Sequence, residues 1–308
     1  MKKTYLAIAA TALMAASAVA QADSSATSYN EVSNLLISVT PGISIGSSAN
    51  NSASLGCLPN GNCVSGGGAG ATDAAASQIG WAGYVQNSYL TNSDPGLSYV
   101  VADASIDSEQ LLGDPFTQAR AFTQGQLVTS ATATGNARNS SATVVFDVGT
   151  AASLSFAFDA DPYLRAFLSS NSIPNAQADA NMSLSVNLYN SANALVFNWA
   201  PDGQAGNITG GSETRDPFSL NIGLTALVGN GGPLVYDPTG CTFGTAGGCF
   251  AATTNILAAG TYTLNLSMQQ GINLVSSVSA VPEPETYGML LSGLALLGFV
   301  ARRKAKQV

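Results

Sequence analysis

Histidine is absent from the sequence, and lysine occurs only near its two ends. Without imidazole there is no Ser-His-Asp or Cys-His catalytic machinery, no histidine metal ligand and no histidine general base. The lack of lysine between residues 23 and 280 also excludes Schiff-base chemistry from that stretch. Catalysis there would depend on carboxylates alone, so we expect a protein that is not an enzyme.

Charged residues are scarce, at 9% of the chain, and most are acidic. Between residues 23 and 280 lie sixteen of the eighteen acidic residues, which with the few cations gives a net charge of about −12. The cations of this stretch are Arg120, Arg138, Arg165 and Arg215. A basic surface for nucleic acid or anionic lipid is therefore not expected. The excess of acidic residues favours solubility outside the cell, and it would also favour the binding of a divalent cation.

The low charge does not indicate disorder, because 46% of the residues are hydrophobic and the mean hydropathy is +0.21. Apolar and polar residues alternate over four segments, which predicts strands with one buried face. These segments are Leu154–Phe158, Met182–Leu188, Phe218–Leu224 and Tyr262–Met268. Further strands are predicted at Asn34–Thr40, Leu97–Asp103, Ala142–Val148 and Ala194–Trp199. Helix is expected to be rare.

The connections between these strands are rich in residues that tolerate turns. Asn190–Asn193 separates two apolar runs and predicts a hairpin. Three glycine-rich stretches predict irregular loops, namely Ser47–Thr72, Pro201–Arg215 and Gly229–Ala252. Many short strands with such turns predict an all-β body over residues 23–280, a single β-sandwich or jelly-roll-like domain.

The four cysteines form two local pairs, Cys57 with Cys63 and Cys241 with Cys249, although four cysteines allow three pairings. Both pairs lie in glycine-rich segments, where the chain can bring two Cα atoms to disulfide distance. In an exported protein oxidation is the default. The spacings do not suit a zinc site, which also usually needs histidine. We therefore predict two local disulfides.

Asp159 and Asp161 are two residues apart, so on an extended backbone both side chains would project from the same face. Such a pair would supply calcium ligands, or the two carboxylates of a glycoside hydrolase across a cleft. A structural interpretation competes with both: Asp159 ends a strand, and Asp161 with Pro162 begins a short helix. The inward-facing residues of that helix would be Leu164, Phe167 and Leu168.

The N-terminal 22 residues have the three parts of a secretory signal peptide. Lys2-Lys3 is followed by the apolar stretch Tyr5–Ala18 and by the A-x-A pattern Ala18-Val19-Ala20. Cleavage is predicted after Ala20 or Ala22, which places the body outside the cytoplasm.

The stretch from Val281 to Lys304 has three parts. Pro282-Glu283-Pro284 is extended because each proline fixes its own φ and disfavours the α region for the residue before it. Tyr287–Ala301 is uncharged, and at 1.5 Å per residue it reaches about 22 Å as a helix. Arg302-Arg303-Lys304 then stops the apolar run, as basic residues do on the cytoplasmic side. We predict a transmembrane helix over residues 286–301 with its C-terminus in the cytoplasm.

These three parts resemble the PEP-CTERM sorting signal of Gram-negative bacteria, which a membrane-embedded exosortase reads. The resemblance covers about Val281 to Lys304 and assigns residues 281–308 to the sorting signal. It implies that Pro282, Glu283 and Pro284 are the recognition element and that Arg302, Arg303 and Lys304 are the stop-transfer cluster. It also implies an inner-membrane-anchored precursor, handled by the secretion machinery and the exosortase. The product is delivered to the cell surface or released, often alongside exopolysaccharide in a biofilm matrix.

Three functions are compatible with these features of the sequence. The first is a non-enzymatic structural protein of the cell surface or extracellular matrix. The second is a carbohydrate- or calcium-binding module, in which aromatic side chains would stack on sugars if they were exposed and would be core residues if buried. The third is a carboxylate-dependent glycoside hydrolase. No cofactor other than calcium is suggested, and the aromatic candidates are Trp81, Tyr84, Tyr99 and Trp199.

Overall fold

The computed structural model describes residues 24–39, 43–58, 62–71, 73–79, 97–106, 118–128, 131–169, 175–230, 232–239, 241 and 248–276. Ala22–Ser277 forms one compact unit. The predicted signal peptide with Ala20 and Ala22, the transmembrane helix and the sorting signal lie outside the described residues. Within the described ranges, no helix is long and apolar enough to cross a membrane.

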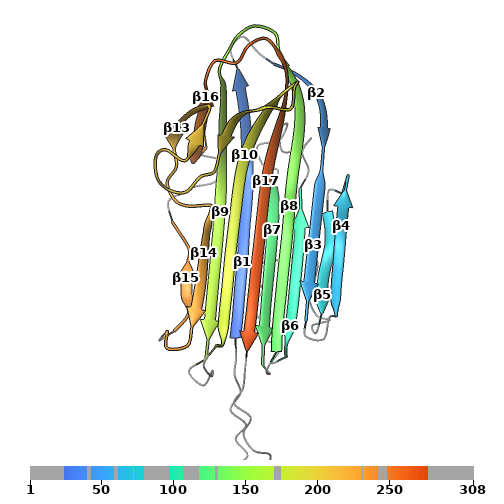
Figure 1. The fold of residues 1–308 in the computed structure, drawn as a ribbon, viewed down its shortest axis with the longest axis vertical. Helices are drawn as coiled ribbons and strands as arrows, with labels where there is room; N and C mark the ends of the chain where they lie inside the picture. Colours follow the sequence, from blue (N-terminus) through green and yellow to red (C-terminus); the bar gives the residue numbers. More distant parts are fainter. Residues whose placement is uncertain are drawn as a thin grey trace, which may run out of the picture. The chain divides into compact units, whose positions relative to one another are not determined.

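The described chain is all-β and forms two antiparallel sheets whose long strands run along a common axis (Figure 1). In sheet A, of eight strands, the order is β13 (Gly211–Arg215), β16 (Phe250–Thr254), β9 (Leu154–Leu168), β1 (Ser24–Val39), β7 (Gln118–Leu127), β6 (Tyr99–Ser105) and β5 (Asp73–Ile79), with β15 (Leu234–Tyr236) paired to β9. Sheet A therefore has β1 at its centre.

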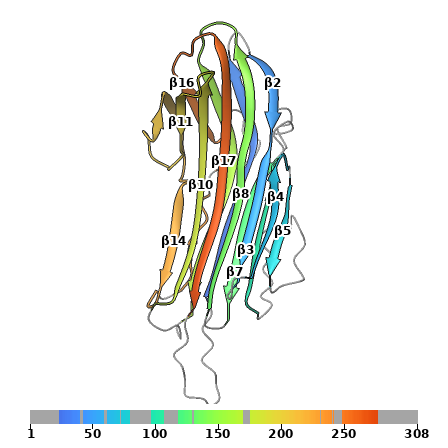
Figure 2. The ribbon, with the colours of Figure 1, turned by 45° about the vertical axis from the view of Figure 1, so that its right-hand side comes forward.

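In sheet B, of nine strands, the order is β12 (Ile208–Thr209), β11 (Leu195–Trp199), β10 (Gln177–Asn190), β17 (Gly260–Ser276), β8 (Ala131–Val148), β3 (Asn51–Cys57) and β4 (Cys63–Ala69). Two further strands join it, β14 (Ile222–Leu227) on β10 and β2 (Ile43–Ala49) on β8. Figure 2 shows β10, β17 and β8 side by side. The all-β, sandwich-like prediction is confirmed, and the strands outnumber the eight of a jelly roll.

The inward faces follow the period-two pattern of the sequence. On β10 the buried residues include Met182, Leu184, Val186 and Leu188, and the residues between them face outward. The strand is longer than the predicted segment because Ala178 and Ala180 continue the alternation. Three of the four alternating segments thus lie inside longer strands, whereas the fourth is strand only from Ile222 onward.

The predicted helix that begins at Asp161 is wrong, because β9 continues to Leu168. The sequence after the predicted N-cap keeps the period of two: Pro162, Leu164, Ala166 and Leu168 are all buried, and Phe167 between them is only half-buried. Pro162 is tolerated because it lies between the segments of β9 that pair with β16 and with β15.

The three glycine-rich loops were also predicted incorrectly, because each contains strands. Ser47–Thr72 includes β3, β4 and the end of β2, and Pro201–Arg215 includes β12 and β13. Gly229–Ala252 includes β15 and the start of β16. β4 consists mainly of small residues, and β12 and β15 have only two and three residues, so these strands show no apolar period in the sequence. The predicted hairpin at Asn190–Asn193 is confirmed, with Asn193 in the left-handed region at a φ of 58°.

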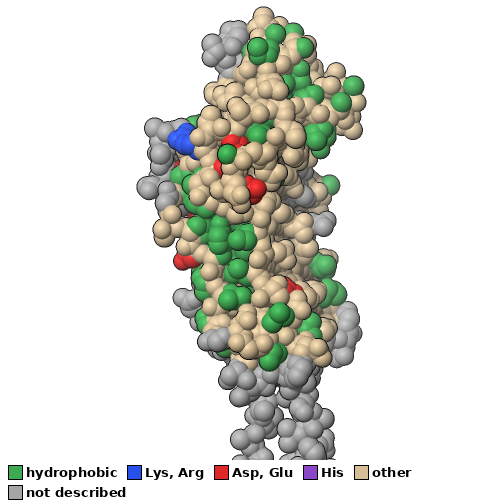
Figure 3. Space-filling model, turned by 60° about the vertical axis from the view of Figure 1, so that its left-hand side comes forward, with side chains coloured by type: hydrophobic (Ala, Val, Ile, Leu, Met, Phe, Trp, Pro, Cys, Tyr) green, Lys and Arg blue, Asp and Glu red, His purple; other side chains and the backbone are tan. Residues whose placement is uncertain are grey.

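The core lies between the inward faces of the two sheets. One hydrophobic cluster contains Phe156 and Phe158 of sheet A together with Phe197 and Trp199 of sheet B. A second cluster lies further along the strands and contains Leu164 of sheet A with residues of sheet B such as Met182 and Ile272. On the face drawn in Figure 3 most side chains are uncharged, with scattered acidic groups and few basic ones.

Candidate functional site

Both predicted disulfides are present. Cys57 and Cys63 are register partners on β3 and β4 with Cα atoms 4.1 Å apart, so their bond closes this hairpin. Cys241 and Cys249 have Cα atoms 5.6 Å apart and precede β16. The described residues contain no free cysteine, so no thiol is available there as a nucleophile or metal ligand.

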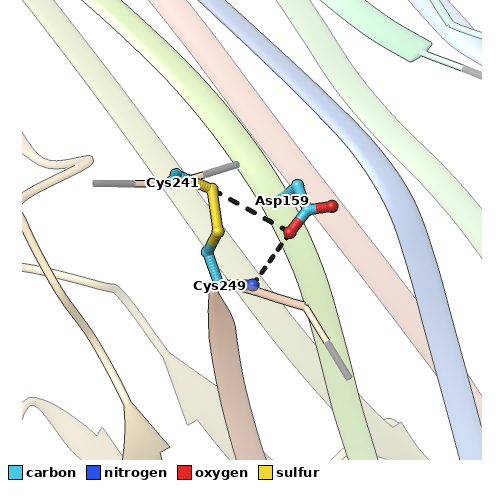
Figure 4. Close-up of side chains that lie close together, drawn as sticks. All are labelled: Asp159, Cys241 and Cys249. Carbon is cyan, nitrogen blue, oxygen red and sulfur yellow. Dashed lines mark hydrogen bonds between the residues drawn. A yellow bond between two sulfur atoms is a disulfide. The ribbon is translucent and has the colours of Figure 1, made fainter. Parts of the chain in front are cut away.

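Asp159 lies against the second disulfide (Figure 4). Its side chain is fully buried, and its Oδ1 accepts a hydrogen bond of 2.9 Å from the backbone N–H of Cys249. Oδ1 also lies 3.9 Å from Sγ of Cys241, while Oδ2 accepts a bond of 3.3 Å from Nδ2 of Asn34. Asn34 has a φ of 54° at an irregularity in β1. Asp159 therefore joins β9, β1 and the disulfide-bonded segment.

The cluster of Asp159, Cys241 and Cys249 has ligand atoms within 4.8 Å of one another but does not have the chemistry of a metal centre. Its two sulfur atoms are bonded to each other, so neither is a thiolate. Gly248 has a φ of 67°, and a Cβ at this position would lie 2.7 Å from the backbone nitrogen of Phe158. The disulfide-bonded segment at Gly248 therefore packs directly on the backbone of β9, which indicates a structural role for it.

Asp161 has partners different from those of Asp159. It is exposed, and the register of β1 and β9 places it opposite Glu31. Partial desolvation, followed by the negative charges of Glu31 and Asp237, raises the pKa of the Asp161 carboxyl. Calcium binding by Asp159 and Asp161 stays a prediction. The two side chains have different neighbours, since Asp159 bonds to Cys249 and Asn34 whereas Asp161 lies beside Glu31.

Glu31 is the centre of a polar cluster on the outer face of sheet A. Its Oε2 accepts a hydrogen bond from the hydroxyl of Tyr29 and another of 2.9 Å from Nε of Arg120. Burial, then the bond to Glu31, raises the pKa of Tyr29. Arg120 and Asp161 flank Glu31 in register on β7 and β9. Sequence reasoning missed this cluster because only the register brings its members together.

A third group of acidic residues lies in the segment after β11. Oδ2 of Asp216 accepts hydrogen bonds of 2.9 and 3.0 Å from the backbone N–H groups of Asp202 and Gly203. Glu213 accepts bonds of 2.8 Å from Nε1 of Trp199 and 2.9 Å from the N–H of Gly206. The two carboxylates therefore bind backbone N–H groups of the segment that follows β11, and Glu213 also binds the Trp199 ring.

Asp216→Asn is expected to stabilise the protein at pH 7 but not at pH 4. The pKa of the Asp216 carboxyl is raised to about 6, chiefly by desolvation and in addition by the negative charges of Glu213 and Asp202. Because the folded state then holds this proton to higher pH than the unfolded state, the contribution of Asp216 to stability falls as the pH rises from about 4 to about 6. Urea midpoints at both pH values measure the effect.

Asp147→Asn, on β8, controls for the loss of one negative charge in this comparison. An Asp216→Asn variant that lost stability at pH 7, or gained as much at pH 4 as at pH 7, would contradict the expected pH dependence.

The aromatic candidates for sugar stacking that the structure describes are buried. Trp199 is fully buried and Tyr99 is 2% exposed. Trp199 packs on Phe158 at a ring separation of 5.5 Å. Trp81 and Tyr84 lie outside the described residues. Trp199 and Tyr99 are therefore core residues and not a binding platform.

Comparison with known families identifies the other functional element. Residues 280–304 match the family model described as the PEP-CTERM protein-sorting motif. The chain carries a PEP-CTERM motif. This motif is that of an exported protein sorted by an exosortase, through a membrane-anchored precursor, to the cell surface. No curated protein and no solved structure matches the chain.

The PEP-CTERM motif contains the sequence-predicted residues Pro282, Glu283 and Pro284 and ends at the basic cluster Arg302-Arg303-Lys304. All of them lie outside the residues that the structure describes, so their roles rest on sequence. The functional site with the strongest support is thus the sorting motif, and the clusters of the body have structural contacts.

Proposed function

We propose that this protein is a non-enzymatic structural component of the bacterial surface layer or biofilm matrix, processed by an exosortase at or near Pro282-Glu283-Pro284. The PEP-CTERM motif carries the proposal, because it accounts for export and sorting. In this proposal Tyr287–Ala301 presents the motif to the enzyme in the inner membrane, and Arg302-Arg303-Lys304 holds the precursor there.

The contacts of the body support a structural role. The four cysteines are used in disulfides, and Asp159 is buried as an acceptor for the backbone and for Asn34. The described candidates for sugar stacking are in the core. Glu31 and Asp161 lie opposite each other, but Glu31 is 7% exposed and bound to Arg120, which leaves little of it accessible to a substrate.

Replacing Pro282, Glu283 and Pro284 together by alanine is expected to abolish processing and surface delivery, with the uncut precursor accumulating in the inner-membrane fraction. The reason is that alanine removes both the fixed φ of the prolines and the one charge of the recognition element. Fractionation and intact mass of the protein in each fraction measure the result.

Glu285→Ala is the matched control, since it removes the same charge two residues further on. Unchanged mass and unchanged surface delivery of the triple variant would contradict the proposed processing. A matrix that is unaltered in a strain lacking the protein would contradict the structural role separately.

A further inference from the structure

Four fully buried polar residues lie together between the two sheets. Ser28 and Asn30 are two residues apart on β1, and Thr123 on β7 is the register partner of Ser28. Across the sandwich, Oγ of Ser28 lies within hydrogen-bond distance of two oxygen atoms of sheet B, Oε1 of Gln270 on β17 at 2.6 Å and the backbone carbonyl oxygen of Asn181 on β10 at 2.7 Å. All four have an exposed fraction of 0%. We call these four residues the interior polar cluster.

The interior polar cluster separates the two hydrophobic clusters of the core. On β1, Val32 belongs to one hydrophobic cluster and Ala26 to the other, with Ser28 and Asn30 between them. On β17 the same division falls between Met268 and Ile272, on either side of Gln270. Both sheets therefore contribute polar groups at the same level of the sandwich.

Within the part of the chain that the structure describes, several polar atoms of the cluster have no hydrogen-bond partner. They are Oδ1 and Nδ2 of Asn30, Oγ1 of Thr123 and Nε2 of Gln270. Buried side-chain polar atoms almost always have a partner, either in the protein or in an ordered water molecule. A group of them at one level of the core therefore indicates a bound species.

The mixture of donors and acceptors identifies that species. Oδ1 of Asn30 accepts, Nδ2 of Asn30 and Nε2 of Gln270 donate, and Oγ1 of Thr123 does both. An anion would satisfy only the donors, and a cation only the acceptors. Water donates and accepts, and buried waters typically make about three hydrogen bonds to otherwise unsatisfied groups.

We propose that the interior polar cluster is a binding site for buried water, which links Asn30 and Thr123 in sheet A to Gln270 in sheet B. The water completes the hydrogen bonds that the Ser28–Gln270 contact leaves open. Because its partners come from β1, β7 and β17, the water also fixes the level at which the two sheets face each other.

The test compares Thr123→Val with Thr254→Val by oxygen-17 relaxation dispersion of the protein purified from the cells that make it. Both changes replace a buried hydroxyl by a methyl group of the same shape. Oγ1 of Thr254 already bonds to the protein, accepting from the Leu154 N–H at 3.0 Å and donating to the Asn255 carbonyl at 2.7 Å. We expect Thr123→Val to reduce the signal of long-lived internal water and Thr254→Val to leave it unchanged.

An equal dispersion signal in wild type and Thr123→Val would overturn the proposal. So would a high-resolution crystal structure of the wild-type protein in which Asn30 and Gln270 bond only to protein groups, or in which the space between them is dry. The wild-type crystal structure decides the question even if both variants fail to fold.

Discussion

Replacing Trp199 by alanine is expected to lower the free energy of unfolding by about 3–5 kcal/mol. Among the described residues, Trp199 is the largest fully buried side chain. Its ring, from sheet B, lies 5.5 Å from that of Phe158 in sheet A, and Phe158 stacks on Phe250 at 5.0 Å. Phe218 meets Phe250 edge to face at 5.1 Å. Alanine would leave a cavity where this aromatic group joins the two sheets.

Urea denaturation measures this loss, and two variants separate its causes. Trp199→Phe keeps most of the ring but removes the Nε1 donor to Glu213, so a smaller loss of about 1–2 kcal/mol is expected. Leu195→Ala, on the same strand but 51% exposed, should change stability by less than about 0.5 kcal/mol. A Trp199→Ala loss no larger than that of Leu195→Ala would show that the aromatic group does not hold the sheets together.

Asp159→Leu is expected to lower the free energy of unfolding by about 2–4 kcal/mol, because it leaves two buried donors without an acceptor. These donors are the backbone N–H of Cys249 and Nδ2 of Asn34, which bond to opposite oxygens of the carboxyl group. Asp159→Asn has the same shape and keeps one acceptor, so its cost is expected to be smaller. Urea denaturation with the disulfides intact gives both values.

Asp161→Asn is the matched control for this series, two residues along the same strand. Asp161 is exposed beside the negative charges of Glu31 and Asp237, so its neutralisation should leave the midpoint unchanged or raise it slightly. If Asp159→Leu and Asp161→Asn had equal effects, Asp159 would not be the junction between β9, β1 and the disulfide-bonded segment.

The sequence predicted the central strands and both disulfides because each leaves a local pattern. Met182–Leu188 alternates with polar residues and lies in β10, and each cysteine pair is separated by fewer than ten residues. The strand after Asp161 was missed because an Asp-Pro pair begins helices more often than it continues strands. β4 was missed because Gly66–Gly68 has no apolar side chain to repeat, although its backbone pairs with β3.

The clusters of the body could not be predicted in the same way, because their members meet only through the register of the strands. Glu31 meets Arg120 and Asp161 across three strands, and Asp159 meets Cys249 from 90 residues away. The interior polar cluster has the same origin, since Ser28 and Gln270 are separated by 242 residues. The type of a residue suggests whether it could belong to a functional site, but only the pairing of the strands decides which side chains come into contact.

The placement of β17 has a mechanical consequence. β17 ends at Ser276, opposite Ala131, and β1 begins at Ser24, opposite Leu127, so the short β7–β8 connection puts both ends of the sandwich at the same pole (Figure 1). β17 is hydrogen-bonded along its length to β8 and over most of it to β10. A force applied to Ser276 along β17 therefore loads the interstrand hydrogen bonds in shear. The hydrogen bonds to β8 and to β10 share this force, so they do not break one pair at a time.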